Sequence, residues 1–163
     1  TWLDNLRAEP QRNGHVLLMR TLSKFGLAGV RLGYLLGPQA LVAEIDKVRP
    51  PYNVSVLNSE AALFALEHAD VFAAQAQELC AQRTALVAAL QAMEQVEKVW
   101  PSEANMVLLR VPDAARTQAA MKARGVLVKN VSALHPLLAN CLRLTVGSAE
   151  ENTQMLAVLQ ESL

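Results

Sequence analysis

The sequence is poor in cysteine and in aromatic residues, and neither sign of charge is in excess. Its two cysteines, Cys80 and Cys141, are isolated from each other, which excludes a short cysteine-based metal motif. We therefore expect two free and mostly buried thiols, as in a cytoplasmic protein. Fifteen basic and fifteen acidic side chains cancel, so the net charge gives no reason to expect nucleic acid or an anionic membrane surface as a partner.

Long hydrophobic runs are missing as well, although 52% of the residues are hydrophobic. No run approaches the roughly 20 apolar residues that a membrane-spanning helix needs, so we expect no membrane partner. The three histidines have no partner at metal-ligand spacing, and we expect no metal site. What the sequence does contain is enough apolar material for the core of one domain or of two small ones.

One stretch, residues 20–34 with the sequence RTLSKFGLAGVRLGY, combines residues that suit a specific chemistry. An apolar run before it reads as a short buried strand, and Lys24 then follows Thr21 and Ser23 in a loop with two glycines. A lysine in a partly desolvated loop is shifted towards its neutral amine, the form that condenses with a carbonyl group. The hydroxyl groups and the planar guanidinium of Arg31 suit a phosphate. The pattern favours a phosphorylated aldehyde cofactor, whereas a lone lysine after a strand is more often only a solvated side chain.

The segment Thr-Leu-Ser-Lys, followed by Gly-Leu-Ala-Gly-Val-Arg-Leu-Gly-Tyr, resembles the cofactor-lysine segment of fold-type I aminotransferases and is most similar to that of histidinol-phosphate aminotransferases. The resemblance implies that Lys24 binds pyridoxal 5'-phosphate (PLP) covalently and later moves a proton between substrate and cofactor. It also implies that Arg31 binds the phosphate group of PLP, and that Ser23 and Thr21 donate hydrogen bonds to it. Because the commonest spacing from lysine to arginine in the family is one residue longer, we expect a tighter loop here.

Three residues nearer the end of the chain are candidates for binding the substrate. The segment Cys-Leu-Arg-Leu-Thr-Val-Gly around Arg143 resembles the closing strand of the same family, where an arginine binds a substrate carboxylate. Lys129 stands where these enzymes often have an arginine at the far end of the substrate, and Asn105 matches an asparagine near the substrate. From the residues alone, Arg143 would be a solvent-facing residue of a strand, and Asn105 would equally well satisfy a neighbouring loop.

The alternation of strand and helix patterns indicates an α/β fold. The resemblance makes residues 1–57 the carboxyl-terminal part of the large PLP-binding domain, with the end of its sheet. Residues 58–95 are expected to form a long connecting helix or helices, and residues 96–163 a small carboxyl-terminal α/β domain. From apolar periodicity and turn residues we expect strands at 16–19, 32–36, 97–100, 104–111, 126–129 and 142–146, and helices at 39–48, 58–93, 114–124 and from 149 onward.

Side chains that cap helices predict where several of these helices begin. Asn58 or Ser59 is expected to cap the long helix, and Asp70 is expected to cap a second helix after a break. Asp113 is expected to cap the following helix. The run Ser-Ala-Glu-Glu that begins at Ser148 has the spacing of a capping box, and it predicts the start of the last helix.

The resemblance implies a transferase of amino-acid biosynthesis, which moves an amino group between histidinol phosphate and 2-oxoglutarate in histidine biosynthesis. Such enzymes are homodimers with active sites at the subunit boundary and are roughly twice as long as this chain. We therefore expect a fragment with little or no transaminase activity of its own. Two related PLP enzymes stay open, an aromatic-amino-acid aminotransferase and an amino-acid decarboxylase. A different class also stays open, a non-catalytic α/β module that binds the cofactor weakly or serves only in subunit contact.

Overall fold

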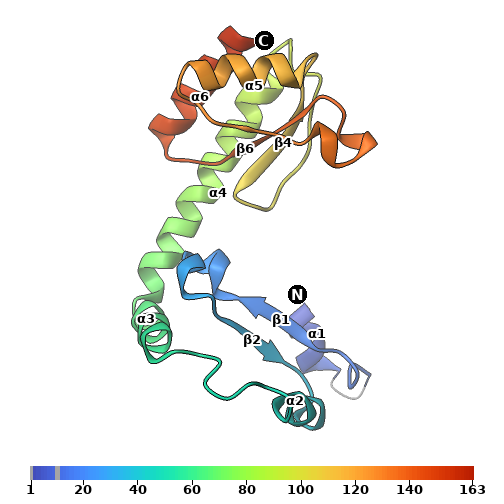
Figure 1. Ribbon diagram of the computed structural model, residues 1–163, viewed down its shortest axis with the longest axis vertical. Helices are drawn as coiled ribbons and strands as arrows, with labels where there is room; N and C mark the ends of the chain where they lie inside the picture. Colours follow the sequence, from blue (N-terminus) through green and yellow to red (C-terminus); the bar gives the residue numbers. More distant parts are fainter. Residues whose placement is uncertain (1, 10–11) are drawn as a thin grey trace. The chain divides into compact units, whose positions relative to one another are not determined.

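The computed structural model describes residues 2–9 and 12–163, and the chain divides into two compact units, Thr1–Ala73 and Ala74–Leu163. Each unit combines helices with short strands (Figure 1), so the expected mixed α/β class is confirmed. The division falls inside the long helix α4 (Ala69–Gln91). The finer domain bounds expected from the sequence stay predictions.

The first unit is organised around a β-hairpin. β1 (Leu18–Thr21) and β2 (Gly33–Leu36) pair antiparallel, with Leu18 opposite Leu36 and Thr21 opposite Gly33. This places the Lys24 segment in the connection at the tip of the hairpin. The other elements before α4 are α1 (Trp2–Ala8), η1 (Leu22–Phe25), η2 (Ala28–Val30), α2 (Gln39–Asp46) and α3 (Val56–Glu67), where η marks a 3-10 helix.

The start of α3 differs from the prediction. Ser55 caps the helix, because its hydroxyl accepts a hydrogen bond from the backbone N–H of Asn58 at 3.2 Å. The prediction that Asn58 or Ser59 caps it is therefore wrong, since both lie inside the helix. The predicted break is present, but α4 already begins at Ala69, so Asp70 lies in its first turn instead of capping it. An acidic residue in that turn still suits the positive end of the helix.

The second unit is a four-stranded antiparallel sheet covered by helices. The strands lie in the order β3 (Lys98–Val99), β4 (Met106–Arg110), β6 (Cys141–Thr145) and β5 (Lys129–Asn130). Figure 1 shows α5 and α6 beside this sheet. The remaining elements are α5 (Ala114–Ala123), η3 (Ser132–Leu134), η4 (Pro136–Leu138) and α6 (Ala149–Ser162).

Alternate residues of the two central strands form the core of the second unit. Val107 and Leu109 of β4 and Leu142 and Leu144 of β6 are fully buried, as expected for one face of a strand with period two. They pack against apolar side chains from the helices, which include Leu86, Leu90, Met121, Met155 and Leu159. The opposite face of the sheet carries two of the candidate substrate residues, Arg143 and Lys129.

Two of the predicted caps are confirmed. The carboxylate of Asp113 accepts hydrogen bonds from the backbone N–H groups of Ala115 and Arg116, at 3.1 and 2.9 Å. Ser148 and Glu151 form the reciprocal capping box at the start of α6. Both signals are local, because each cap and its partners lie within three residues of one another.

The strand predicted at 126–129 is too long. The N–H of Val126 donates to the carbonyl of Met121, and the N–H of Gly125 donates to that of Lys122. These bonds close the end of α5, where Gly125 adopts a φ of +82°, as glycine often does after a helix. The backbone is thus still engaged with the helix at Val126, and β5 is limited to Lys129–Asn130.

Cys141 is buried as predicted, but Cys80 is exposed. The prediction for Cys80 is wrong because α4 is exposed over residues 73–81. Within the described residues, no helix is both long and apolar enough to cross a membrane. The same residues contain no group of three or more His, Cys, Asp or Glu side chains that could hold a metal ion.

Candidate functional site

The four residues expected to bind the cofactor lie at the tip of the β1–β2 hairpin. Thr21 ends β1 and caps η1, which contains Ser23 and Lys24. Arg31 follows η2, two residues before β2 begins. The connection is closed by a hydrogen bond of 3.0 Å from the N–H of Leu22 to the carbonyl of Leu32. The hairpin therefore brings both ends of the motif together.

The hydroxyl group of Thr21 organises the start of η1. It accepts a hydrogen bond from the N–H of Ser23 at 3.0 Å and lies 2.9 Å from the hydroxyl oxygen of Ser23. The carbonyl oxygen of Leu32 is a second acceptor at 3.4 Å. A hydroxyl has one hydrogen to donate, and the Ser23 oxygen is the nearer acceptor. Ser23 accepts that bond and keeps its own hydroxyl hydrogen for another partner.

Arg31 occupies an uncommon backbone conformation. Its φ of +50° and ψ of +33° place it in the left-handed region, which costs a residue with a side chain about 1–3 kcal/mol. The connection contains two 3-10 turns, with Gly26 in the left-handed region after the first turn and Arg31 in the same region after the second. Strain of this kind is concentrated at functional sites.

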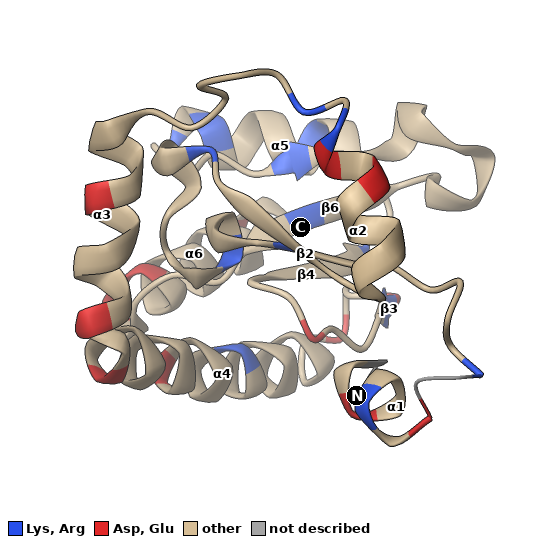
Figure 2. Cartoon of the chain, turned by 90° about the horizontal axis from the view of Figure 1, so that it is seen from below, with Lys and Arg blue, Asp and Glu red and all other residues tan. Residues whose placement is uncertain are grey.

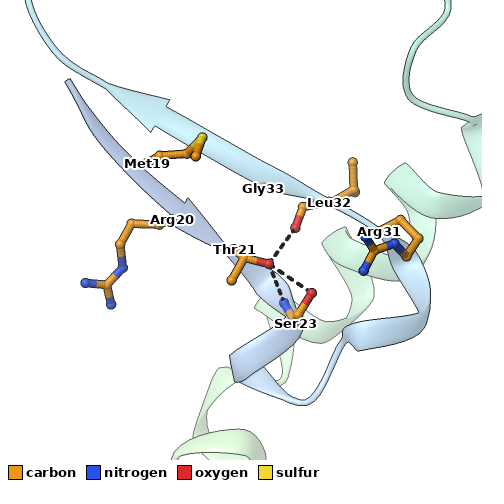
Figure 3. Close-up of a pocket in the computed structure, with 7 residues that line it drawn as sticks. All are labelled: Met19, Arg20, Thr21, Ser23, Arg31, Leu32 and Gly33. Atoms are coloured by element: carbon orange, nitrogen blue, oxygen red, sulfur yellow. Dashed lines mark hydrogen bonds between the residues drawn. The ribbon is translucent and has the colours of Figure 1, made fainter. Parts of the chain in front are cut away.

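A cavity of about 280 Å³ lies beside these residues (Figure 3). In Figure 3 the hydroxyl groups of Thr21 and Ser23 lie close together, and the side chain of Arg20 points away from them. The cavity thus has arginine side chains and two hydroxyl groups among its lining residues. It is lined by Met19, Arg20, Thr21, Ser23, Arg31, Leu32 and Gly33.

Lys24 lies on the same turn as Ser23 but does not line this cavity. Its side chain is exposed, whereas Leu22, Ser23 and Phe25 of η1 are half-buried. It makes no hydrogen bond or ion pair within the described residues. The expected partial desolvation of the amine is therefore not met here, because Lys24 is the residue of η1 that faces away from the packed side of the turn.

Arg143 and Lys129 lie directly opposite each other on β6 and β5. Arg143 is half-buried and Lys129 is exposed, and neither side chain has a hydrogen bond or ion pair in the part of the chain that the structure describes. Both line a second cavity, of about 330 Å³. Its other lining residues are Gln118, Leu127, Val128 and Thr145.

The strands of the second unit carry four basic residues and no acidic residue (Figure 2). Strand register places all four on one face. Lys98 is opposite Arg110, and Lys129 is opposite Arg143. The two pairs share a face because Arg143 is also opposite Leu108, which lies two positions from Arg110 on β4. Like charges directly opposite each other destabilise a sheet. This face is therefore suited to an anion.

Arg110 already has partners on that face, and Arg143 does not. The guanidinium of Arg110 donates hydrogen bonds to the carbonyls of Ala139 and Leu137, at 3.1 and 2.8 Å, and lies 5.4 Å from the ring centre of Trp100. It thereby ties the loop before β6 to β4. Of the two arginines, Arg143 has its guanidinium available for a ligand.

Asn105 lies just before β4 and is exposed. Its backbone carbonyl accepts a hydrogen bond of 3.0 Å from the N–H of Val146. Its side chain makes no hydrogen bond among the described residues and does not line the cavity beside Arg143. The structure therefore brings Arg143 and Lys129 together and leaves Asn105 outside their cavity.

Two contacts at these sites could not be predicted from the sequence. Phe72 of α4 packs against the turn that carries Lys24, through Phe25 at a ring-centre distance of 4.9 Å. Gln118 of α5 lines the cavity beside Arg143 and donates a hydrogen bond to the carbonyl of Val128 at 2.9 Å. Neither residue belongs to a local motif, so no signal in a single sequence identifies it.

Comparison with known proteins places this geometry in a family. The family model described as aminotransferase class I and II matches residues 3–159. A histidinol-phosphate aminotransferase from Paracidovorax citrulli (strain AAC00-1) is 78% identical over 163 residues, which are 100% of this chain and 44% of that protein. The chain thus spans less than half the length of this relative.

Two solved structures share the fold. The histidinol-phosphate aminotransferase from Clostridium acetobutylicum matches with a TM-score of 0.83 and 18% identity, over 94% of this chain and 47% of its own. The histidinol-phosphate aminotransferase from Sinorhizobium meliloti, solved in complex with pyridoxal-5'-phosphate, matches with a TM-score of 0.70 and 24% identity, over 91% and 41%. The family match covers nearly all of the chain and confirms the resemblance seen around Lys24. The chain belongs to the family of class I and II aminotransferases.

Proposed function

We propose that this chain is the carboxyl-terminal part of a PLP-dependent histidinol-phosphate aminotransferase, which transfers an amino group between histidinol phosphate and 2-oxoglutarate. The observation that carries the proposal is the cavity lined by Arg31, Thr21 and Ser23, together with Lys24 on the same turn as Ser23. The 78% identity to a histidinol-phosphate aminotransferase supports it. On this proposal the hairpin unit belongs to the large domain, and the four-stranded sheet is the small domain.

The residues around the first cavity fit the phosphate end of PLP. A guanidinium binds two phosphate oxygens at once, and the hydroxyl hydrogen of Ser23 is free to donate to a third. The hydroxyl of Thr21 already serves the backbone and side chain of Ser23, so its role here is to orient Ser23. Arg31, Ser23 and Thr21 would thus hold the phosphate group as a set.

When bound, PLP supplies an aldehyde that bonds covalently to a lysine amine and a ring that withdraws electrons from the substrate. Lys24 lies one residue after Ser23 on the same turn, and on this proposal its amine would hold the aldehyde end of PLP. The Nζ atom of Lys24, when its amine is free, could accept and return a proton as a general base and acid. Its exposure and lack of a partner leave it free to move.

We propose that Arg143 and Lys129 bind the anionic group of the substrate. Both substrates carry such groups, a phosphate in histidinol phosphate and carboxylates in 2-oxoglutarate. The planar guanidinium of Arg143 suits a carboxylate. The ammonium group of Lys129 can bind a phosphate or a carboxylate, because it imposes no fixed geometry on its partner. A bound anion would also relieve the repulsion between these two opposed cations. Asn105 is kept as a weaker candidate, because it lies outside their cavity.

We propose a homodimer as the assembled state and the cytoplasm as the location. What supports a subunit contact is the apolar surface of α3, where Leu57 is 80% exposed and Phe64 is 61% exposed. Large apolar side chains exposed together on a surface mark an interaction site. Sedimentation of a full-length enzyme that carries this sequence tests the dimer, and a monomer at micromolar concentration contradicts it.

The cofactor proposal is tested by covalent trapping on the whole 163-residue chain. The chain is incubated with PLP and reduced with borohydride, and mass spectrometry measures pyridoxyl labelling at each lysine. We expect labelling to favour Lys24 over the other lysines, which are Lys47, Lys98, Lys122 and Lys129. Lys24→Ala should abolish the selective label, whereas Lys47→Ala, an equal change at an exposed lysine of the same unit, should not. Even labelling of all five lysines would contradict the proposal.

The substrate is tested in a full-length enzyme that carries this sequence. We expect glutamate to form from 2-oxoglutarate with histidinol phosphate as the donor, at higher kcat/KM than with an aromatic amino acid. Preference for the aromatic donor would favour the aromatic aminotransferase, and release of carbon dioxide from an amino acid would favour the decarboxylase. The 163-residue chain alone is expected to show little or no turnover, because it spans 44% of its relative.

A further inference from the structure

The turn that carries Lys24 rests against one aromatic ring of another element. The ring of Phe25, the residue after Lys24, stacks on the ring of Phe72 in α4 with centres 4.9 Å apart and an angle of 25° between the planes. Both side chains are half-buried. A stacked pair of this kind holds two segments in a defined orientation.

The same ring also lies against the backbone of the turn. Gly26 has a φ of +92°, and a Cβ atom placed there would lie 3.2 Å from both Cδ1 and Cε1 of Phe72. That distance is shorter than nearly all real contacts of a Cβ atom. Glycine is thus required twice, by its conformation and by the close approach of the ring. Phe72 therefore contacts the two consecutive residues that follow Lys24.

The remaining bonds of η1 are local to the hairpin tip. The N–H groups of Gly26 and Leu27 both donate to the carbonyl of Leu22, and the N–H of Leu22 donates to Leu32. These bonds fix the shape of the turn but connect it only to the hairpin itself. The packing on Phe72 is the contact that fixes the turn against α4.

We propose that Phe72 is a positioning residue for Lys24, because its ring sets the direction in which η1 presents the lysine amine to the aldehyde of the cofactor. Lys24 has no bond of its own within the described residues, so its direction depends on the backbone of η1. Covalent capture of a carbonyl requires the reacting atoms in contact and aligned. The inference rests on the proposed PLP function and assigns to Phe72 a role at that same site.

The test compares three variants of the 163-residue chain in the PLP-trapping assay. Phe72→Ala should lower the ratio of label at Lys24 to label at Lys47 by about tenfold or more, since a misplacement of about 1 Å can slow a reaction about 100-fold. Phe72→Tyr keeps the ring and should restore the ratio. Val71→Ala is the matched control, because Val71 is the preceding apolar residue of α4 and its side chain is 49% exposed.

A second measurement does not depend on the cofactor. Amide hydrogen exchange without PLP should show faster exchange at Gly26 and Leu27 in Phe72→Ala, with exchange in β4 and β6 unchanged. This pattern separates displacement of the turn from loss of the fold. An unchanged labelling ratio in Phe72→Ala, or an equal loss in Val71→Ala, would overturn the role of Phe72. A wild-type chain with no preference for Lys24 would overturn the proposed function and this inference together.

Discussion

Thr21 acts through one hydroxyl group, which accepts from the N–H of Ser23 and donates within the same turn. Thr21→Val keeps the shape of the side chain and removes both bonds. We expect a loss of about 1 kcal/mol in local stability, the usual effect of removing an N-cap, and weaker binding of PLP because Ser23 loses its orientation. Titration with PLP measures the effect, and Thr21→Ser should restore it.

Thr153→Val serves as the matched control for Thr21. The hydroxyl of Thr153 donates to the carbonyl of Ala149 at 2.8 Å within α6 and caps no helix. PLP binding should therefore be unchanged in this variant. Equal weakening in the two variants would show that the Thr21 hydroxyl has no specific part in the cofactor site.

Glu150 gives the sheet unit a dependence on pH. Its pKa is lowered by a hydrogen bond from its own backbone N–H and by a second from the hydroxyl of Ser148, at 2.9 Å. A carboxylate with a lowered folded-state pKa stabilises the fold fully above its unfolded pKa, and this stabilisation is lost as the pH falls through the folded pKa. Glu150→Gln should therefore lower the unfolding midpoint at neutral pH, and the difference from wild type should shrink in acid.

Thermal unfolding of wild type and Glu150→Gln at a series of pH values measures this difference. Glu60→Gln makes the same change on α3, away from the capping box. A difference between wild type and Glu150→Gln that stays constant from neutral to acid pH would contradict the assigned cause.

At the level of elements, the β1–β2 hairpin depends on a glycine at Gly33. A Cβ atom there would lie 2.7 Å from the carbonyl oxygen of Arg20, so Gly33→Ala must displace the strand opposite. We expect a loss of about 1–3 kcal/mol, as for other overpacked positions. Gly29→Ala is the control in the same connection, because a Cβ atom at Gly29 meets nothing within 4 Å. Chemical denaturation compares the two, and equal stability of both variants would contradict the steric argument.

Elements defined by neighbouring residues were predictable from the sequence. Asp113 and Ser148 cap helices through partners within three residues, and both predictions were confirmed. The start of α3 was missed because the capping hydroxyl belongs to Ser55, three residues before the predicted start at Asn58. β5 was predicted too long because the bonds that end α5 use the same apolar residues, as Val126 shows.

The candidate sites also were predictable only where their residues are close together in the sequence. The grouping of Thr21, Ser23 and Arg31 follows from a motif and is seen around one cavity. The exposure of Lys24 and the packing of Phe72 on its turn depend on which segments meet in space. Phe25 and Phe72 are far apart in the sequence, so a single sequence contains no signal that pairs them.

Across the whole molecule, buried side chains are unequally distributed. In the described part of the first unit the buried residues are Ala62 and Ala65, whereas the second unit buries the central residues of β4 and β6. A two-stranded hairpin without a covering core is marginally stable. We expect amides of β4 and β6 to be strongly protected from hydrogen exchange and amides of β1 and β2 to exchange much faster. Equal protection in both units, measured on the whole chain, would contradict this division.

The opposed cations of β5 and β6 have a consequence for solution behaviour. Because no carboxylate on the sheet compensates Lys129 and Arg143, dissolved counter-ions must do so. Raising ionic strength normally weakens surface ion pairs by screening, but here it screens a repulsion. The second unit should accordingly melt at higher temperature in sulfate than in chloride of equal ionic strength, as divalent oxyanions gather where two positive side chains face each other.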